Sequence, residues 1–330
     1  MKNLLFLPAV ALSLVLVPAG VTGIGSRRAA EAETTAAIGD VGPAAADRTA
    51  DGEEAIAVFM PQTDRAETLS MRDYVIGCVA AEMPAAYEPE ALKAQAAASA
   101  TLARYMRAHN TDNAALKGGV IAADPGSYQG YLDNGALRER WGDSFDAYYK
   151  KIADAVDEAL PYVITCAGEP IEAAFHAVSS GRTENAEVIW GKAEPYLVSV
   201  ESEGDRLSPG YASGETVAPE AFCEKLGLSP GDTPPEDWLG DAEYTPAGTL
   251  TEISVCGKTF TGLGLRRAFS LRSPAVRLRF DGEDFVFSVT GYGHGVGMSQ
   301  YGADYYARQG MTWREILAHY YPGTELTLYA

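Results

Sequence analysis

YVIGCVAAEMP, residues 74–84, predicts the end of an amphipathic helix that a proline terminates. Ser70 offers an N-cap, so we expect the helix to run from Met71 to Met83, and Pro84 cannot continue it. Residues spaced as i, i+1, i+4, i+5 and i+8 lie on one face of a helix. In this helix they are Tyr74, Val75, Cys78, Val79 and Glu82. A carboxylate on or beside an apolar stripe is costly to bury, so Glu82 is a candidate functional residue.

A second helix is predicted from Pro89 to His109, with seven alanines between Ala91 and Ala103 that let another backbone approach closely. Further helices are expected at Trp141–Ala159, Pro219–Leu226, Ser299–Gln309 and Thr312–Tyr320, the last with a capping box. Strands are expected at Ile56–Met60, Tyr162–Cys166, Ile171–His176, Leu250–Cys256, Val276–Phe280 and Phe285–Val289. Helices and strands follow one another without regular βαβ order, which indicates an α+β fold: one domain of mixed helices and antiparallel strands.

The composition divides the chain into three parts. Residues 1–28 form an apolar segment that ends in two arginines, and residues 29–55 are poor in large apolar side chains, as in a solvated, flexible linker. Residues 56–330 carry the predicted domain. Within it, residues 201–247 are rich in Gly, Pro, Asp and Glu and resemble an insertion or a lid.

The apolar run from Asn3 to Ser26 has two interpretations. It is either a cleaved signal peptide, with small residues near 21–23 as the cleavage site, or an uncleaved single-span membrane anchor. Its length favours the anchor. In both cases we expect the domain to lie outside the cytoplasm, held at the cell membrane or secreted.

The formal net charge of −19 excludes some partners. Nucleic acid binding requires a basic face, and an anionic membrane surface would repel such a chain, so we expect membrane contact through the N-terminal segment only. A neutral or weakly charged substrate is easier to accommodate.

The four cysteines show no CxxC spacing and therefore no zinc-ribbon signature. Export would permit disulfides, and Cys223 with Cys256 is one candidate pair, but the sequence leaves the connectivity open. Cys78 fits a small buried residue of the first helix.

GYGHGVGMSQYGA, residues 291–303, is the densest local signal in the chain. Five glycines in its first twelve residues indicate positive φ angles or close approach of the backbone to a neighbour or ligand. The motif is neither a P-loop nor a dinucleotide fingerprint. It is either a turn between hairpin and helix or the floor of a groove. In the second case its polar contacts would be His294, Ser299 and Gln300, next to Tyr301.

Several blocks in a fixed order resemble the stage II sporulation protein D family over residues 56–330. They are residues 74–84, EALKAQA at 90–96, GHGVGMSQYGA at 293–303 and ILAHYYPGT at 316–324. Between them, Phe175-His176, Ser180-Gly181, Thr183, Trp190-Gly191 and 195–197 match the middle of the family pattern.

The resemblance implies a peptidoglycan lytic transglycosylase that cuts glycan strands stripped of stem peptides during engulfment of the forespore. Other wall hydrolases of engulfment, such as an amidase, would be its partners. The family's catalytic acid falls on Glu82. A lytic transglycosylase needs no water, so one carboxyl can protonate the glycosidic oxygen and then accept a proton from the 6-hydroxyl of N-acetylmuramic acid. Burial would raise its pKa for this role. From the residues alone, Glu82 could instead be a cap or a partner of Lys93.

Other positions are candidate substrate contacts. Lys93 and Gln95 could bind the sugar or orient Glu82, while Gln129 and Tyr131 resemble a family Gln-x-Tyr element. Tyr131 could stack on a sugar or belong to the core. The full candidate set is Lys93, Gln95, Arg104, Gln129, Tyr131, Ser180, His294, Ser299, Gln300 and Tyr301.

No cofactor is expected, although some family members bind zinc through a histidine of the Phe-His block and nearby cysteines. Residues 175–182 contain no cysteine, and Cys166 could approach His176 only if their two strands paired.

One departure keeps a second function open. The family usually has arginine and an aromatic residue where this chain has Ala100 and Leu102, and Arg104 lies one turn later as a substitute. If Arg104 does not substitute, the protein could be a wall-binding amidase enhancer without activity of its own. A metal-dependent hydrolase is a third alternative.

Overall fold

The computed structural model of this protein describes residues 48–49, 52–110 and 113–329. The expected leader, residues 1–28, and most of the expected linker, residues 29–55, lie outside the described residues. In the part of the chain that is described, no helix combines the length and the apolar character needed to cross a membrane.

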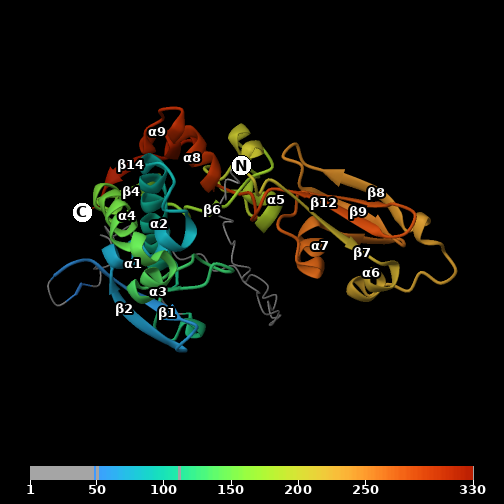
Figure 1. Cartoon of the computed structure of the whole chain (residues 1–330), viewed down its shortest axis with the longest axis horizontal. Helices are drawn as coiled ribbons and strands as arrows, with labels where there is room; N and C mark the ends of the chain where they lie inside the picture. Colours follow the sequence, from blue (N-terminus) through green and yellow to red (C-terminus); the bar gives the residue numbers. More distant parts are fainter. Residues whose placement is uncertain (1–47, 50–51, 111–112, 330) are drawn as a thin grey trace, which may run out of the picture. The chain divides into compact units, whose positions relative to one another are not determined.

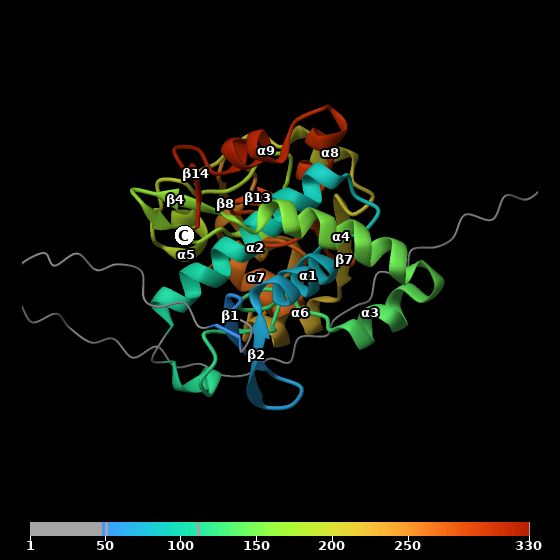
Figure 2. The ribbon, with the colours of Figure 1, turned by 90° about the vertical axis from the view of Figure 1, so that its left-hand side faces the viewer.

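Helix α2 (Pro89–His109) is the centre of the helical part, and its bounds agree with the prediction. Its seven alanines between 91 and 103 are fully buried. Helices α1 (Met71–Glu82), α4 (Phe145–Ala159), α8 (Gln300–Arg308) and α9 (Trp313–Tyr320) all contact it. Figures 1 and 2 show α1, α2 and α4 side by side. Small side chains on α2 allow this close packing.

The predicted helix caps are confirmed. Ser70 Oγ accepts a hydrogen bond from the Asp73 amide at 3.0 Å and begins α1. Thr312 and Glu315 form a reciprocal capping box at the start of α9. The remaining helices are α3 (Asn134–Trp141), α5 (Ala186–Trp190), α6 (Pro219–Leu226) and α7 (Gly262–Phe269), with 3-10 turns η1 (Ala114–Leu116), η2 (Gly142–Ser144), η3 (Glu203–Leu207) and η4 (Pro235–Asp237).

The strands form small sheets, which together with the helices make an α+β fold. They are β1 (Ala55–Met60), β2 (Arg65–Ser70), β3 (Ile121–Ala122), β4 (Tyr162–Cys166), β5 (Glu169–Pro170), β6 (Phe175–His176), β7 (Ala212–Val217), β8 (Leu239–Tyr244), β9 (Leu250–Val255), β10 (Lys258–Phe260), β11 (Val276–Phe280), β12 (Phe285–Thr290), β13 (Met298–Ser299) and β14 (Glu325–Leu328). Most pairs are antiparallel, as expected, but β1 with β3 and β6 with β13 are parallel. The predicted hairpin of β11 and β12 is confirmed.

Residues 201–247 are tied to the chain that follows them rather than standing alone. Strand β7 pairs with β12, and β8 pairs with β9. The strands and helices between 212 and 290 enclose a second hydrophobic cluster, distinct from the main one around α2, with stacked aromatic rings at its centre: Phe222, Trp238, Phe269, Phe285 and Phe287. The segment therefore contributes β7, α6, η4 and β8 to this second cluster, and the residues that follow supply the rest of it.

Two predicted elements are wrong in extent. The helix expected over 141–159 begins only at Phe145, because Gly142 ends the separate helix α3 at a φ of +49°. The strand expected over 171–176 is reduced to Phe175–His176. Ile171 still bonds to Ile164, but the Ala174 amide turns back to the Glu172 carbonyl, which interrupts the ladder.

Candidate active site around Glu82

Glu82 lies in the last turn of α1, where three segments far apart in the sequence meet. Its Oε1 accepts a hydrogen bond from the backbone N–H of Gly130 at 2.6 Å. Its Oε2 accepts one from the side-chain amide of Gln300 at 3.2 Å. The end of α1, the loop before α3 and the start of α8 therefore hold one carboxyl from two sides.

Burial controls the protonation of Glu82. Removal of water around the carboxyl disfavours its charged form and raises its pKa, and this outweighs the bonds from Gly130 and Gln300, which favour the carboxylate. Both donors are neutral, and among the described residues no Lys, Arg or His forms an ion pair with Glu82. Such a carboxyl can keep its proton at a higher pH than a surface glutamate and still be stabilised once the proton has left.

The start of α8 fixes the position of Gln300. Ser299 is the N-cap, and its Oγ accepts from the Gly302 amide at 3.2 Å. The same hydroxyl donates to the buried Asp205 carboxylate at 2.7 Å, and Asp205 also accepts from the Ser179 amide at 2.8 Å. Ser299 is fully buried, so it holds the helix in place rather than facing a ligand.

Gln95 stands behind Gln300. Its Oε1 lies 3.4 Å from Gln300 Nε2, and its own Nε2 donates to Ser99 Oγ at 3.1 Å. Gln95 has no exposed surface, so it is a positioning residue and not the sugar contact that we considered. Because Gln95 and Glu82 both offer acceptors, the amide of Gln300 must turn its nitrogen toward them.

The loop before α3 presents the Gly130 amide to Glu82. Gln129 is fully buried and donates to Tyr74 Oη at 3.0 Å and to the Ser99 carbonyl at 3.3 Å. Tyr131 stacks on Tyr74 with ring centroids 5.8 Å apart and is half-buried. The Gln-x-Tyr element therefore anchors both flanks of Gly130.

Gly130 is a site residue that the sequence reasoning missed. A Cβ at this position would lie 3.0 Å from Glu82 Oε1, so a side chain would crowd the carboxyl. The available signal was a glycine between the two matched residues of the Gln-x-Tyr element.

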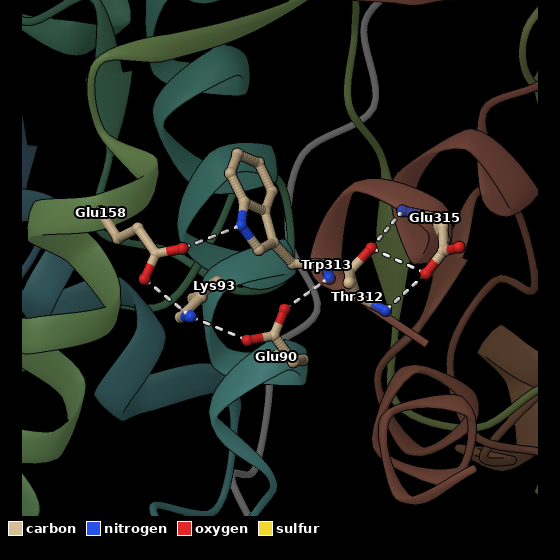
Figure 3. A network of polar contacts seen from close by, with 6 residues as sticks. All are labelled: Glu90, Lys93, Glu158, Thr312, Trp313 and Glu315. Atoms are coloured by element: carbon tan, nitrogen blue, oxygen red, sulfur yellow. Dashed lines mark hydrogen bonds and ion pairs between the residues drawn. The ribbon is translucent and has the colours of Figure 1, made fainter. Parts of the chain in front are cut away.

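Lys93 does not contact Glu82. It forms ion pairs with Glu90 and Glu158, each at 2.7 Å, and these carboxylates also bind the indole and backbone N–H groups of Trp313. Figure 3 shows this network joining α2, α4 and α9. The interpretation of Glu82 as a partner of Lys93 is therefore wrong, because the Lys93 ammonium group is paired with Glu90 and Glu158 instead.

Arg104 is not the substitute for the family arginine that we considered. It lies nine residues after Gln95, about 13 Å along the same helix. It is buried there against Glu54 at 2.7 Å, and it also donates to the Tyr162 and Leu160 carbonyls. Ala100 itself is fully buried. Glu54, at the end of the expected linker, is thus part of the folded domain.

The glycine-rich loop packs directly on residues 174–179. Its alternate glycines at 291, 293, 295 and 297 all have positive φ. A Cβ on Gly297 would overlap the carbonyl oxygen of Ala174. The chain can therefore follow this path only with glycine at 297.

Val296 holds two histidine rings through its backbone. Its carbonyl accepts from His176 Nδ1 at 3.1 Å, and its amide donates to His294 Nδ1 at 3.0 Å. The ring centroids lie 5.7 Å apart. Burial lowers the pKa of His176 to about 4 and that of His294 to about 3, so both rings are neutral at pH 7.

Cys166 and His176 do not fit the zinc site that some family members carry. Strand β4, with Cys166, pairs with β5 and β14, whereas β6, with His176, pairs with β13. The strand pairing that would bring Cys166 to His176 is absent from the described sheets. No group of three or more His, Cys, Asp or Glu with a metal-binding arrangement occurs in the described ranges.

Two further candidates make local contacts. Ser180 Oγ donates to the Ala247 carbonyl, and Tyr301 Oη donates to the Leu207 carbonyl at 3.2 Å. The described cysteines are free, with Cys78 buried as expected and Cys223 and Cys256 half-buried.

Comparison with known proteins gives consistent results. A family model described as "Stage II sporulation protein" matches residues 61–165. The chain is 37% identical to stage II sporulation protein D of Bacillus subtilis (strain 168) over 82% of this chain and 78% of the relative. It is 36% identical to the protein of that name from Bacillus amyloliquefaciens, with the same coverage. The amidase enhancer of B. subtilis is 26% identical over 77% of this chain but only 40% of its own length.

Proposed function

This chain belongs to the stage II sporulation protein D family, and from that premise we propose that it is a peptidoglycan lytic transglycosylase with Glu82 as both acid and base. Its substrate is the glycan strand freed of stem peptides, and its setting is the wall remodelling of engulfment.

The environment of Glu82 is the observation that carries this proposal. Its pKa is raised by burial and moderated by two neutral donors, and no second carboxylate is among the described groups that shift it. Glycoside hydrolases use a pair of carboxyl groups, one of them to activate water or to attack the sugar. A single carboxyl that both gives and takes a proton suits intramolecular attack by a substrate hydroxyl.

In the proposed mechanism, one carboxyl serves both proton transfers. Protonated Glu82 donates its proton to the glycosidic oxygen as the bond to the anomeric carbon of N-acetylmuramic acid breaks. The carboxylate that results keeps the hydrogen bonds from Gly130 and Gln300. It then accepts the proton of the muramyl 6-hydroxyl, whose oxygen bonds to the anomeric carbon and closes a 1,6-anhydro ring. Glu82 ends protonated, as it began, and no water or metal takes part.

The proposal also covers the location of the protein, its partner and its cofactors. The N-terminal segment anchors the protein at the cell membrane, or directs secretion if it is cleaved, so that the domain acts outside the cytoplasm. An amidase that removes stem peptides acts before it and is its natural partner. No cofactor is required, and nucleic acid is not a partner.

A second candidate is a wall-binding amidase enhancer without catalytic activity. Similarity to the protein of that name supports it, as does Ala100 at the position where the family usually has arginine. The two candidates differ in whether glycan is cut.

Product analysis separates the candidates. The full chain and its Glu82→Gln variant are incubated with peptide-free glycan strands, with Glu139→Gln at an exposed position as the matched control. We expect ends lighter by one water than hydrolytic ends, formed by the wild type and the control but not by Glu82→Gln. Binding without cleavage supports the enhancer instead, and reducing ends that disappear with chelator indicate a metal-dependent hydrolase.

A further inference from the structure

Two exposed aromatic side chains flank His294. Trp190, the last residue of α5, lies 5.3 Å from the His294 ring between centroids and is 42% exposed. Tyr292, two residues before His294, is 41% exposed. Large aromatic faces left open beside a rigid loop are typical of binding surfaces, and flat aromatic faces suit the apolar face of a sugar ring.

Two arginines adjoin the same aromatic surface. The guanidinium carbon of Arg272 lies 5.6 Å from the centroid of the Tyr292 ring. The backbone carbonyl of Arg272 accepts a hydrogen bond from the Gly293 amide at 3.0 Å. Arg266 Nε donates to the Leu271 carbonyl at 3.3 Å. Leu271 directly precedes Arg272, so this bond ties Arg266 to the segment that carries Arg272.

In the described part of the chain, neither Arg266 nor Arg272 forms an ion pair with a carboxylate. Within the described residues, the arginines that are at least partly buried are Arg72, Arg104, Arg107, Arg182, Arg266 and Arg272. The first four each form an ion pair with Asp or Glu, and Arg266 and Arg272 form none. The chain has 45 acidic residues against 26 Lys and Arg, so partners are plentiful. A partly buried guanidinium whose donors no carboxylate occupies can bind an anionic ligand in a bidentate way.

The cluster connects to the proposed active site through the glycine-rich loop. Ser299 pairs with His176 in the β6–β13 ladder, and the next residue, Gln300, binds Glu82. His176 is 4% exposed, and its Nε2 has no hydrogen-bond partner. Tyr292 and His294 therefore stand on the same loop that leads into Gln300 and the Glu82 site.

We propose that Trp190, Tyr292, Arg266 and Arg272 form a subsite for an anionic sugar, a muramyl residue whose lactyl carboxylate is free. The aromatic side chains hold the ring, and the arginines bind the carboxylate. A stem peptide in amide linkage would remove that negative charge, so the subsite would favour strands from which the peptide has been cut. This inference rests on the proposed function for the identity of the strand.

The test combines two substrates with several protein variants. Peptide-free strands are compared with the same strands after their carboxylates are converted to methylamides. Binding is measured by calorimetry on the full chain carrying Glu82→Gln, so that cleavage does not interfere. We expect the charged strands to bind about tenfold more tightly, as for a charge-assisted hydrogen bond.

Variants assign the preference to residues. Arg272→Gln should reduce the preference severalfold and Arg266→Gln with Arg272→Gln should abolish it, whereas Arg272→Lys should retain most of it. Arg267→Gln, at an exposed position on the same helix, is the control and should leave it intact. Trp190→Leu should weaken binding of both strands by the same factor.

The result that overturns the subsite is equal binding of charged and amidated strands by the parent protein. A preference that survives in the folded double arginine variant overturns it equally. Failure of the proposed function looks different, because the wild type would then cut neither strand while the charge preference in binding remained.

Discussion

Removal of the Gln300 amide should raise the pH at which the proposed glycan cleavage is lost. In the proposed mechanism Glu82 must be protonated to begin the reaction, so activity falls as pH rises through its pKa. Gln300 donates a hydrogen bond that favours the carboxylate and thereby lowers this pKa. Gln300→Met keeps the length of the side chain and removes the donor, so the proton should be held to a higher pH.

The size of the shift follows from the contact. A hydrogen bond to a charged group contributes about 1.5–3 kcal/mol. At 3.2 Å between Gln300 Nε2 and Glu82 Oε2 the bond is at the long end of the normal range, so the lower value applies. At 1.36 kcal/mol per pKa unit, this corresponds to about one unit.

The assay is the pH dependence of kcat/KM for release of anhydro ends from peptide-free strands. The alkaline limb of Gln300→Met should lie about one pH unit above that of the wild type. Gln309→Met makes the same chemical change near the exposed end of α8 and should leave the limb in place. An unchanged or lowered limb in Gln300→Met would refute the assignment of Gln300 as the donor that tunes Glu82.

Three further predictions concern stability, measured by chemical denaturation. Gly297→Ala should cost about 2–5 kcal/mol, from positive φ and from overlap with the Ala174 carbonyl. Gly323→Ala, with similar φ and open space, should cost only about 1–2 kcal/mol, and equal costs would contradict the packing argument. Because the pKa of His176 is lowered to about 4, the unfolded state takes up its proton first as pH falls from 7, so the wild type should lose about 2 kcal/mol by pH 5 relative to His176→Phe. A parallel pH dependence of the two proteins would contradict this. Arg104→Met should cost about 3 kcal/mol by leaving the Glu54 charge poorly paired, without changing kcat, and a selective loss of kcat would return Arg104 to the active site.

Local signals in the sequence placed most of the helices and long strands. Ser70, Pro89 and Thr312 begin helices because their chemistry acts within one turn, and the alternation in residues 276–289 specifies a hairpin directly. The errors arose where long-range contacts or a single backbone angle decided the structure. Gly142 at positive φ ends α3, so the helix expected from Trp141 begins only at Phe145.

In the candidate site, too, local features could be predicted and long-range contacts could not. The position of Glu82 at the end of a helix followed from periodicity and Pro84. The partners of Lys93 and Arg104 could not be inferred, because Glu158 and Glu54 reach them only through tertiary packing. The donor at Gly130 is a backbone N–H, which every residue except proline carries, so only the glycine inside the Gln-x-Tyr element marked the position.

Direct titration of the Glu82 carboxyl tests the central claim, that this half-buried carboxyl keeps its proton when ordinary glutamates have lost theirs. Difference infrared spectra of wild type minus Glu82→Gln, recorded across pH, isolate the stretching band of the protonated acid. The account predicts that this band persists well above pH 4.3, about the ordinary pKa of glutamate, because burial raises the pKa of Glu82. A band that disappears at or below that value would contradict it.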